Sequence, residues 1–427
     1  MDFKNDHAFV QDLDKKDTLN HFRSRFHIPQ HQQEPMLYFT GNSLGLQPKK
    51  TAEYVNQELN DWANLGVEGH FKPGTGWFGY HELLRDSSAR LVGALPQEVV
   101  VMNHLTVNLH LLLVSFYRPD AKRFKIICEA SAFPSDRYAL QSQIKYHGFN
   151  PDEALIELHA KEGEETLRHE DIIAAINEHG DQLALVMLGG LNYYTGQVFD
   201  MKSITDGAHK VGAYAGFDLA HAAGNIKMQL HDWNVDFACW CSYKYLNAGP
   251  GGVSGVFIHQ KHVENTSLPR FAGWWGNDPQ LRFTMPHDFV PVKSADAWQL
   301  SNAPILNMAA LRASMDLFDE AGMDSLTAKG FQLTSYLLYI VRDVMKQCGD
   351  DSLIKVLTPF EKQKQGCQLS LVVKNGRKIF DYLTSRGVVT DWREPDVIRV
   401  APVPMYNSFE DIYKFGVILK DAIQSVK

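Results

Sequence analysis

The stretch FACWCSYKYLNAGPGG, residues 237–252, places one lysine directly after an apolar run and directly before a cluster of glycines. The run FACWCS is typical of a strand that is buried on both faces, and Lys244 follows it where that strand ends. In open parallel sheets, ligands bind beyond the carboxyl ends of the strands. Lys244 is therefore expected at a ligand-binding edge, whereas a lysine in an ordinary loop would be solvated.

Four further short apolar runs have the same character. They are KIICEA (125–130), LALVML (183–188), AYAGF (213–217) and SGVFIH (254–259). Stretches with helical periodicity accompany them, at 50–66, 77–95, 103–117 and 135–147. Buried parallel strands that alternate with helices predict a doubly wound α/β core.

After Pro304 the pattern changes to α+β. Two long helices are expected at 305–323 and 326–347, followed by the strand CQLSLVV, a helix at 376–386, the strand in VIRVAPVP and a closing helix from 409. We therefore expect three parts: a polar helical arm (1–36), a large α/β domain (37–304), and a connecting helix with a small C-terminal α+β domain (305–427).

Composition indicates a large soluble globular protein. The chain has 427 residues, of which 44% are hydrophobic and 22% charged, enough to bury a sizeable core. The formal charge of −8 gives no electrostatic reason to bind nucleic acid or an anionic membrane. The longest apolar stretch, LHLLLVSF, is far shorter than the roughly 20 residues of a membrane span. A cytoplasmic location without nucleic-acid or membrane partners is expected.

Cysteine usage points to buried thiols and not to a metal site. Five cysteines are scattered at positions 128, 239, 241, 348 and 367, which suits a reducing compartment better than a disulfide framework. Cys239 and Cys241 form C-x-C, and no second Cys/His cluster completes a metal site. Packing is therefore the expected role of this pair, and no metal is predicted.

Polar residues after other strands extend the pattern around Lys244. Asp218 and His221 follow AYAGF, while Phe133 and Asp136 lie in SAFPSD after KIICEA. Taken singly, an acid at such a position is most often a helix cap, and a histidine most often forms a hydrogen bond with the backbone. Together, an acid, a lysine and an aromatic ring at one sheet edge match the needs of pyridoxal phosphate. The lysine forms its Schiff base, the acid keeps its pyridine nitrogen protonated, and the aromatic ring stacks on it.

A helix start offers a place for the phosphate. The segment 103–108, NHLTVN, opens a helix whose free N–H groups, with the Thr106 hydroxyl, form a phosphate cradle, although capping alone is the alternative. The glycines after Lys244 do not form G-x-G-x-x-G, because Ser254 takes the last glycine position. A dinucleotide-binding fold is therefore not expected.

Long, ordered blocks of the sequence resemble one family. They are YFTGNSLGLQP, NHLTVNLHLLL, GFDLAHAAGNI, DFACWCSYKYLNAGPGG, RFAGWWG and RVAPVPMYNSFEDIYKF, and they run from about residue 37 to the C-terminus. These blocks are similar to those of kynureninases, which implies an aminotransferase-like, fold type I pyridoxal-phosphate enzyme. The resemblance also implies an amino-acid substrate and a homodimer with active sites at the subunit interface.

The resemblance implies cofactor roles for individual residues. Lys244 is the Schiff-base lysine and the main proton shuttle, and Asp218, supported by His221, pairs with the pyridine nitrogen. The other positions that match are Phe133 on the ring face, Leu105 and Thr106 at the phosphate, Asp136 as a second carboxylate, Gly189 through its backbone, and Trp274 and Asn302 from the partner subunit. Tyr243 matches a phosphate-contacting tyrosine, and its phenol beside Lys244 makes it a candidate acid/base.

Substrate recognition is implied in the same way. Arg399, in VIRVAP, matches the arginine that grips the α-carboxylate, since a planar guanidinium can bind a carboxylate bidentately, and Ser43 matches a further substrate-binding position. His70, Ser301 and Asn302 match positions that favour 3-hydroxykynurenine, because a hydrogen-bonding wall favours the extra hydroxyl. The implied reaction is hydrolysis of the Cβ–Cγ bond of a kynurenine to alanine and an anthranilate, in tryptophan degradation or NAD biosynthesis.

Two alternatives stay open at this point. A cysteine desulfurase or another β-lyase would share the Asp-x-x-His and lysine pattern, but a desulfurase needs a nucleophilic cysteine on a mobile loop. Cys367 comes nearest, although QGCQLSLVV is typical of the start of a strand. The non-enzymatic alternative is an inactive cofactor-binding or scaffold protein, which the joint presence of Lys244, Asp218 and Arg399 disfavours.

Overall fold

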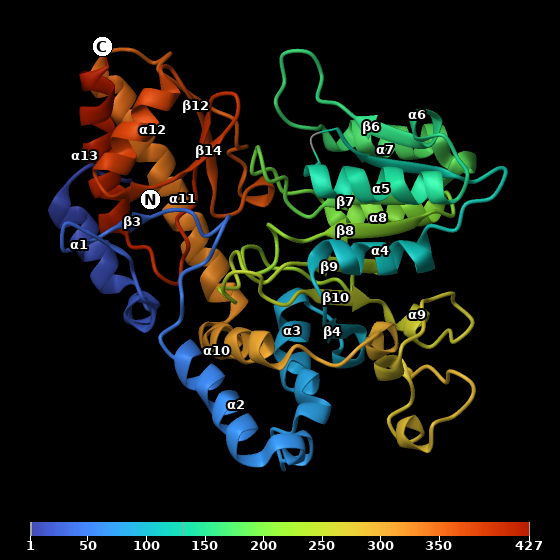
Figure 1. Cartoon of the computed structure of the whole chain (residues 1–427). Coiled ribbons are helices and arrows are strands. Elements are labelled where there is room, and N and C mark those ends of the chain that lie inside the picture. The colour runs from blue at the N-terminus through green and yellow to red at the C-terminus, as the bar shows by residue number, and fades with distance from the viewer. Residues whose placement is uncertain (1, 131, 427) are drawn as a thin grey trace.

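The computed structural model of the chain describes residues 2–130 and 132–426. Its largest sheet has seven strands in the order β4-β10-β9-β8-β7-β5-β6 (Figure 1). In chain order these are β4 (Val99–Val101), β5 (Lys125–Glu129), β6 (Leu155–Leu158), β7 (Leu183–Gly189), β8 (Tyr214–Asp218), β9 (Phe237–Trp240) and β10 (Gly255–Ile258).

The direction of one strand differs from the prediction. Strands β6, β5, β7, β8 and β9 pair in parallel, as their apolar runs predict. Strand β10 pairs antiparallel with both β9 and β4, so the prediction of a further parallel strand at 254–259 is wrong. The glycine-rich loop between β9 and β10 contains no helix that would carry the chain back across the sheet, and an antiparallel return needs only a short connection.

Helices cover both faces of this sheet (Figure 1). Neighbouring residues of one strand, such as Ile126 and Ile127, belong to different apolar clusters, as the alternation of side chains along a strand requires. One face packs against α4 (Leu105–Phe116) and α5 (Pro134–Tyr146), and the other against α3 (Arg85–Val92), α7 (His169–His179), α8 (Met201–Lys210) and α10 (Ile305–Ala321). The helix predicted at 77–95 is a 3-10 helix, η3 (Trp77–Leu84), followed by α3.

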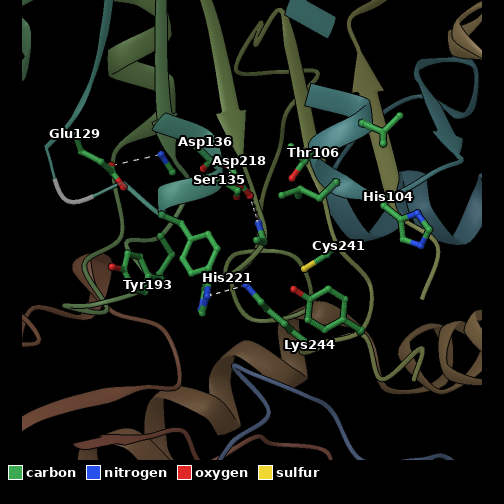
Figure 2. Close-up of a pocket in the computed structure, with 17 residues that line it drawn as sticks. His104, Thr106, Glu129, Ser135, Asp136, Tyr193, Asp218, His221, Cys241 and Lys244 are labelled. Atoms are coloured by element: carbon green, nitrogen blue, oxygen red, sulfur yellow. Dashed lines mark hydrogen bonds between the residues drawn. The ribbon is translucent and has the colours of Figure 1, made fainter. Parts of the chain in front are cut away.

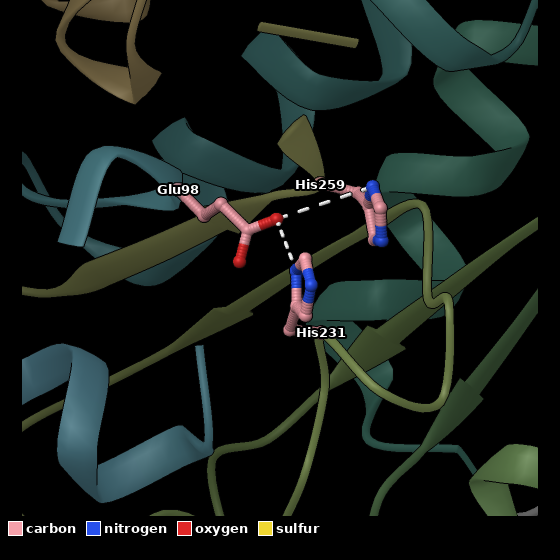
Figure 3. A group of neighbouring side chains, drawn as sticks. All are labelled: Glu98, His231 and His259. Atoms are coloured by element: carbon pink, nitrogen blue, oxygen red, sulfur yellow. Dashed lines mark hydrogen bonds and ion pairs between the residues drawn. The ribbon is translucent and has the colours of Figure 1, made fainter. Parts of the chain in front are cut away.

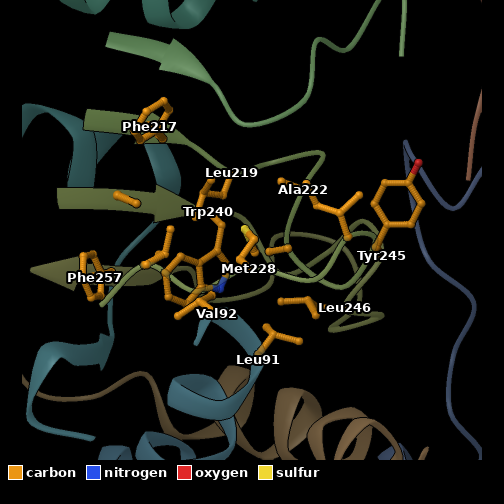
Figure 4. Close-up of a cluster of buried hydrophobic side chains, with 14 of the residues drawn as sticks. Leu91, Val92, Phe217, Leu219, Ala222, Met228, Trp240, Tyr245, Leu246 and Phe257 are labelled. Atoms are coloured by element: carbon orange, nitrogen blue, oxygen red, sulfur yellow. The ribbon is translucent and has the colours of Figure 1, made fainter. Parts of the chain in front are cut away.

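The apolar core reaches the loop that carries Lys244. Figure 4 shows Trp240 at the end of β9, only 1% exposed, in one cluster with Met228, Tyr245 and Leu246. Tyr245 and Leu246 directly follow Lys244 and are each 1% exposed. Because buried side chains precede and follow it, the position of the lysine backbone is fixed by packing.

The region predicted as the small domain has an antiparallel sheet with two different faces. Its strands are β11 (Ile354–Val356), β12 (Leu369–Val373), β15 (Val397–Val400) and β14 (Asp391–Arg393), in that order. Leu369, Ile398 and Val400 pack into the cluster formed with α11 (Met323–Cys348), α12 (Gly376–Ser385) and α13 (Phe409–Ser425). Arg399 lies opposite Asp391 on one side and Ser370 on the other, and opposed residues share a face. The second face is therefore polar.

This polar face meets the large domain. The Ser370 hydroxyl donates to the carbonyl of Tyr194 and the Thr358 hydroxyl to that of Thr195, at 2.6 Å. Both carbonyls belong to the loop after β7, at the edge where ligands are expected. The small domain thus supplies polar groups to that edge.

The beginning of the chain packs on the small domain (Figure 1). Helix α1 (His7–Lys16) contacts α13, where the Asp14 carboxylate accepts the first two N–H groups of that helix at 2.8 and 3.0 Å. Strand β3 (Leu37–Tyr38) pairs in parallel with β13 (Val388–Val389), and the Asn407 amide donates to the Tyr38 carbonyl at 3.0 Å. The division into arm, large domain and small domain stays a prediction.

Two general features of the described chain bear on its class. Cys128, Cys239, Cys241 and Cys367 are buried, as the sequence predicts for its cysteines, and Cys348 is half-buried. Within residues 2–130 and 132–426, no helix combines the length and the apolar character that crossing a membrane demands.

Candidate active site

A cavity of about 330 Å³ lies at the carboxyl ends of β5, β7, β8 and β9 (Figure 2). It is the position that the rule for parallel sheets predicts. The residues predicted for cofactor binding that line it are Leu105, Thr106, Phe133, Asp136, Gly189, Asp218, His221, Tyr243 and Lys244. The structure therefore brings together residues from five separate segments of the chain.

Lys244 lies between His221 and two aromatic rings. Its Nζ is 3.0 Å from His221 Nε2 and 5.8 Å from the ring centroids of Phe133 and Tyr243. Burial, with the added positive charges of Lys244 and Arg399, holds the pKa of His221 well below its ordinary value. His221 is therefore neutral and accepts a hydrogen bond from Lys244. Its Nδ1 is buried without a protein partner among the described residues.

Two carboxyl groups next to Lys244 share a proton. Asp218 ends β8, where its Oδ1 accepts the N–H of Ala220 at 2.6 Å, and its carboxylate is hydrogen-bonded to Asp136. Burial raises the pKa of both acids, and the charge of Asp218 raises the pKa of Asp136 further. Asp136 is therefore the protonated donor, and Asp218 keeps the negative charge that a protonated ring nitrogen needs.

A third carboxyl group, Glu129, also lines the cavity. It is the last residue of β5, only 3% exposed, and it accepts from the Asn192 amide at 3.2 Å and from the Gly189 N–H at 3.4 Å. A Cβ on Gly189 would lie 3.2 Å from its Oε1, so the missing side chain at that position leaves room for the acid. Glu129 was not predicted, although it ends a strand as Asp218 does.

We expect Glu129→Gln to alter the pH dependence of stability in the cofactor-free protein. Burial raises the pKa of Glu129 from 4.5 to about 7, so the folded state binds an extra proton between these pH values. The free energy of unfolding of the wild type therefore falls by about 3 kcal/mol as the pH rises from about 4.5 to about 7. Glutamine does not titrate, and this part of the fall disappears.

Urea unfolding at pH 5 and pH 8 measures the effect. The matched control is Glu153→Gln, which removes an exposed carboxylate from a nearby surface helix and leaves the pH dependence as in the wild type. An equal difference between the two pH values in Glu129→Gln and in the wild type would contradict the expectation.

Arg399 and Ser43 lie together behind the loop that follows β7. The Arg399 side chain is 0% exposed, its Nη1 donates to the Tyr193 carbonyl at 2.7 Å, and its Nη2 donates to the Ser43 hydroxyl at 3.2 Å. Tyr193 lines the cavity, with its ring centroid 5.3 Å from that of Phe133 and 6.3 Å from that of His221. Tyr193, which was not predicted, therefore stands between Arg399 and the cofactor residues.

Besides Arg399 and Ser43, four predicted residues do not line this cavity. Trp274 is 42% exposed, and its indole N–H donates to the Arg282 carbonyl at 3.2 Å. The His70 ring lies against those of its own surface segment, and Ser301 and Asn302 are exposed. The contacts expected of Trp274 and Asn302 would come from a second subunit, and the roles of all four residues stay predictions.

Cys241 contributes to the cavity in addition to the packing role that the sequence predicts. It is buried as expected, but it also lines the cavity and is hydrogen-bonded to the Tyr243 hydroxyl. Burial raises the pKa of the Cys241 thiol, which keeps it uncharged. The thiol therefore orients the phenol next to Lys244.

A separate cluster has the composition of a metal site, but its geometry does not fit one (Figure 3). Oε1 of Glu98 is 2.8 Å from His231 Nδ1 and 3.9 Å from His259 Nδ1. The two imidazole rings are stacked, with centroids 5.0 Å apart and planes at 8°. A ring nitrogen binds a metal in the plane of its ring, and two stacked rings cannot direct their lone pairs at one ion. Glu98 also accepts two backbone N–H groups, so we interpret the cluster as structural.

Comparison with known proteins identifies the family. Residues 326–419 match the family model described as kynureninase C-terminal domain. Kynureninase of Flavobacterium psychrophilum is 55% identical to the chain over 99% of both sequences. Kynureninase of Myxococcus xanthus is 51% identical over 97% of this chain and 96% of its own. The chain belongs to the kynureninase family. The resemblance drawn from the sequence blocks is thereby confirmed.

Solved structures agree with the fold expected of a kynureninase. The cystine C–S lyase C-DES superposes with a TM-score of 0.73 at 16% identity, over 90% of this chain and 97% of its own. The cysteine desulfurase CsdA of Escherichia coli gives a TM-score of 0.75 at 15% identity, over 96% and 98%. At these identities the likeness concerns the fold, and it confirms the predicted fold type I architecture of pyridoxal-phosphate enzymes.

Proposed function

We propose that this kynureninase-family chain hydrolyses the Cβ–Cγ bond of L-kynurenine and 3-hydroxy-L-kynurenine, giving L-alanine and anthranilate or 3-hydroxyanthranilate. The cofactor is pyridoxal phosphate. The observation that carries the proposal is the cavity in which Lys244 contacts His221 and lies beside Asp218. Such an enzyme serves tryptophan degradation or NAD biosynthesis, and we place it in the cytoplasm.

The residues of the cavity fit pyridoxal phosphate. Lys244 would hold its aldehyde carbon, Asp218 its ring nitrogen and Phe133 its ring face, while the start of α4 with Thr106 and Tyr243 would hold its phosphate. The buried Nδ1 of His221, unpaired within the described protein, offers a bound group a hydrogen-bonding site. When bound, the cofactor supplies the electron sink that makes the substrate Cα–H acidic.

The chain's own residues then move protons and hold the substrate. Lys244 takes the proton from Cα, and the hydrogen bond to neutral His221 keeps its Nζ in place. Burial raises the pKa of Tyr243, so its phenol stays protonated and can donate to the substrate's γ-carbonyl oxygen or β-carbon. Arg399 and Ser43 bind the α-carboxylate.

Anaerobic assays test the proposal. Purified protein loaded with pyridoxal phosphate is mixed separately with L-kynurenine and 3-hydroxy-L-kynurenine, and alanine and the aromatic acid are quantified. Equal molar release of both products supports the proposed reaction. No cleavage by protein that carries its cofactor would redirect the assignment to another β-lyase, and the absence of cofactor absorbance would favour an inactive scaffold.

We further propose a preference for the 3-hydroxy substrate, on the basis of His70, Ser301 and Asn302. A wall of hydrogen-bonding groups discriminates against a ligand that leaves them unpaired. The ratio of the two kcat/KM values measures the preference. Equal values for the two substrates would contradict it.

A homodimer with shared sites is the proposed assembly. Phe71, Phe283 and Trp274 are 60%, 52% and 42% exposed, an unusual concentration of aromatic surface around His70. The rings of Phe78 and Phe283, 4.8 Å apart, join the two surface segments involved. Sedimentation equilibrium of the loaded protein should give twice the chain mass of 48.3 kDa. A monomer that cleaves kynurenine at full rate would refute the shared site.

A cysteine desulfurase is the weaker assignment. Cys367, its nearest candidate nucleophile, is 2% exposed, and its N–H donates to the Asn225 side chain at 2.8 Å. Burial raises the pKa of this thiol to about 12, far from the thiolate that attack on sulfur requires. The cysteine desulfurases therefore share the fold of this chain, but Cys367 does not fit the role of their nucleophile.

A further inference from the structure

The carboxylate of Asp391 lies against both residues proposed to bind the substrate carboxylate. Asp391 on β14 is directly opposite Arg399 on β15. Its Oδ2 accepts from the Nη2 of Arg399, from the hydroxyl of Ser43 and from the Nη2 of Arg393, the last at 3.2 Å. Three donors from three segments thus converge on one oxygen of a side chain that is only 12% exposed.

The opposite edge of the Arg399 guanidinium is fixed as well. Its Nη1 donates to the Tyr193 carbonyl at 2.7 Å, and Gln368 donates to the same carbonyl at 3.1 Å. The Nε–H of Arg399 is buried and has no partner within residues 2–130 and 132–426. A buried arginine with an unpaired N–H group can donate a further hydrogen bond to an acceptor on a ligand.

The charges around Asp391 leave room for one more anion. Arg393 and Arg399 bring two positive charges, and Asp391 offsets one of them. The side chain of Arg393 is 36% exposed, so water screens part of its charge, whereas Arg399 is buried. An incoming α-carboxylate would pair with Arg399, and a paired buried charge is far less costly than an unpaired one. The cluster is therefore balanced for a ligand with one carboxylate.

We propose that Asp391 is the positioning residue of this carboxylate site. It holds Arg399 and Ser43 in their binding orientation before the substrate arrives, and it limits the cluster to one uncompensated positive charge. The inference rests on the proposed function for the identity of the substrate. Asp391 itself takes no part in the chemistry at Cα.

Asp391→Asn in the cofactor-loaded enzyme tests the proposal. We expect KM for L-kynurenine to rise about tenfold or more, because misplaced recognition groups lose binding steeply. We expect kcat to stay within about threefold, because Lys244 and its surroundings are unchanged. The dissociation constant of L-alanine, followed by the change in cofactor absorbance, should rise by a similar factor.

The alanine titration separates this proposal from the proposed function. Alanine carries the α-amino and α-carboxylate groups but has no bond to cleave. If the wild type binds alanine and does not cleave kynurenine, the function is wrong while Asp391 is still tested. An unchanged alanine affinity in Asp391→Asn would overturn the positioning role whatever the substrate.

Two further variants sharpen the test. Asp381→Asn removes an exposed carboxylate that pairs with Arg377 on α12, and it should change neither constant. Asp391→Asn combined with Arg393→Met restores the balance of charge without restoring the contacts to Arg399. We expect KM to stay raised in this double variant. Full recovery would mean that Asp391 only neutralises Arg393, and would overturn the positioning role.

A last variant controls for the possibility that Asp391→Asn fails to fold. Asp391→Glu keeps the buried charge that the two arginines require, but moves the oxygen by one methylene. Thermal unfolding establishes that it is folded. We expect a raised KM, and a wild-type KM in folded Asp391→Glu would count against the proposal.

Discussion

Lys244→Ala is expected to leave a folded protein that cleaves neither kynurenine at a measurable rate, a loss of at least about 10³-fold. Among the described residues that line the cavity, Lys244 carries the only amine. With the roles proposed for Lys244, the variant loses both the covalent anchor for the cofactor and the base that takes the Cα proton. Product analysis after prolonged incubation measures the loss, and cofactor absorbance records the missing covalent link.

Lys202→Ala is the matched control for this variant. Lys202 lies on the exposed side of α8, where it pairs with Asp206 at 2.7 Å, and its removal should leave turnover unchanged. Cleavage by Lys244→Ala above about one hundredth of the wild-type rate, beyond the range of a lost general base, would contradict the assigned role. Thermal unfolding of both variants distinguishes lost chemistry from lost structure.

Arg399→Lys is expected to lower kcat/KM about 100-fold or more, although the charge is conserved. Lysine has one nitrogen in place of the planar fork, so it cannot reach the Tyr193 carbonyl, Ser43 and Asp391 at once. The effect should lie mainly in KM, because the lost contacts hold the substrate carboxylate. Steady-state kinetics with L-kynurenine, at substrate concentrations well above the wild-type KM, measure it.

Arg386→Lys is the control for Arg399→Lys, since Arg386 is exposed and lies beside the Tyr382 ring on the surface. Its kinetics should match those of the wild type. A kcat/KM within about threefold of the wild type in Arg399→Lys would show that a point charge suffices, against the fork geometry argued above.

The positions of Lys244 and Asp218 at the edge of the sheet could be predicted from the sequence, because each residue follows a strongly apolar strand. Such runs are local signals, and the rule that ligands bind at the carboxyl ends of parallel strands turns them into a site. The parallel pairing of β8 with β9 brings the carboxyl ends of these two strands next to each other. The long helices α10 and α11 are likewise confirmed, since their periodicity extends over many turns.

Other features depend on contacts that no local pattern encodes. An apolar run has the same composition in either direction, so the antiparallel course of β10 could not be read from it. The edge strands β4 and β6 are too short for a periodic signal. Asp391 and Tyr193 both contact Arg399, and the contact with Tyr193 spans 206 positions of sequence. Arg399 and Ser43 themselves were predicted only through the family resemblance.

The pairing of β3 with β13 also determines when the N-terminal part of the chain can fold during synthesis. The hydrogen bond between Asn407 and the Tyr38 carbonyl joins residues 369 positions apart in sequence, and ribosomes add about 5–20 residues per second. Phe39, fully buried in the finished protein, therefore waits about 20 to 70 s of synthesis for the partners that cover it. During that time Leu37 and Phe39 have none of the partners from residue 333 onward that pack against them in the folded protein. A premature stop before residue 388 would leave β3 without its partner strand β13.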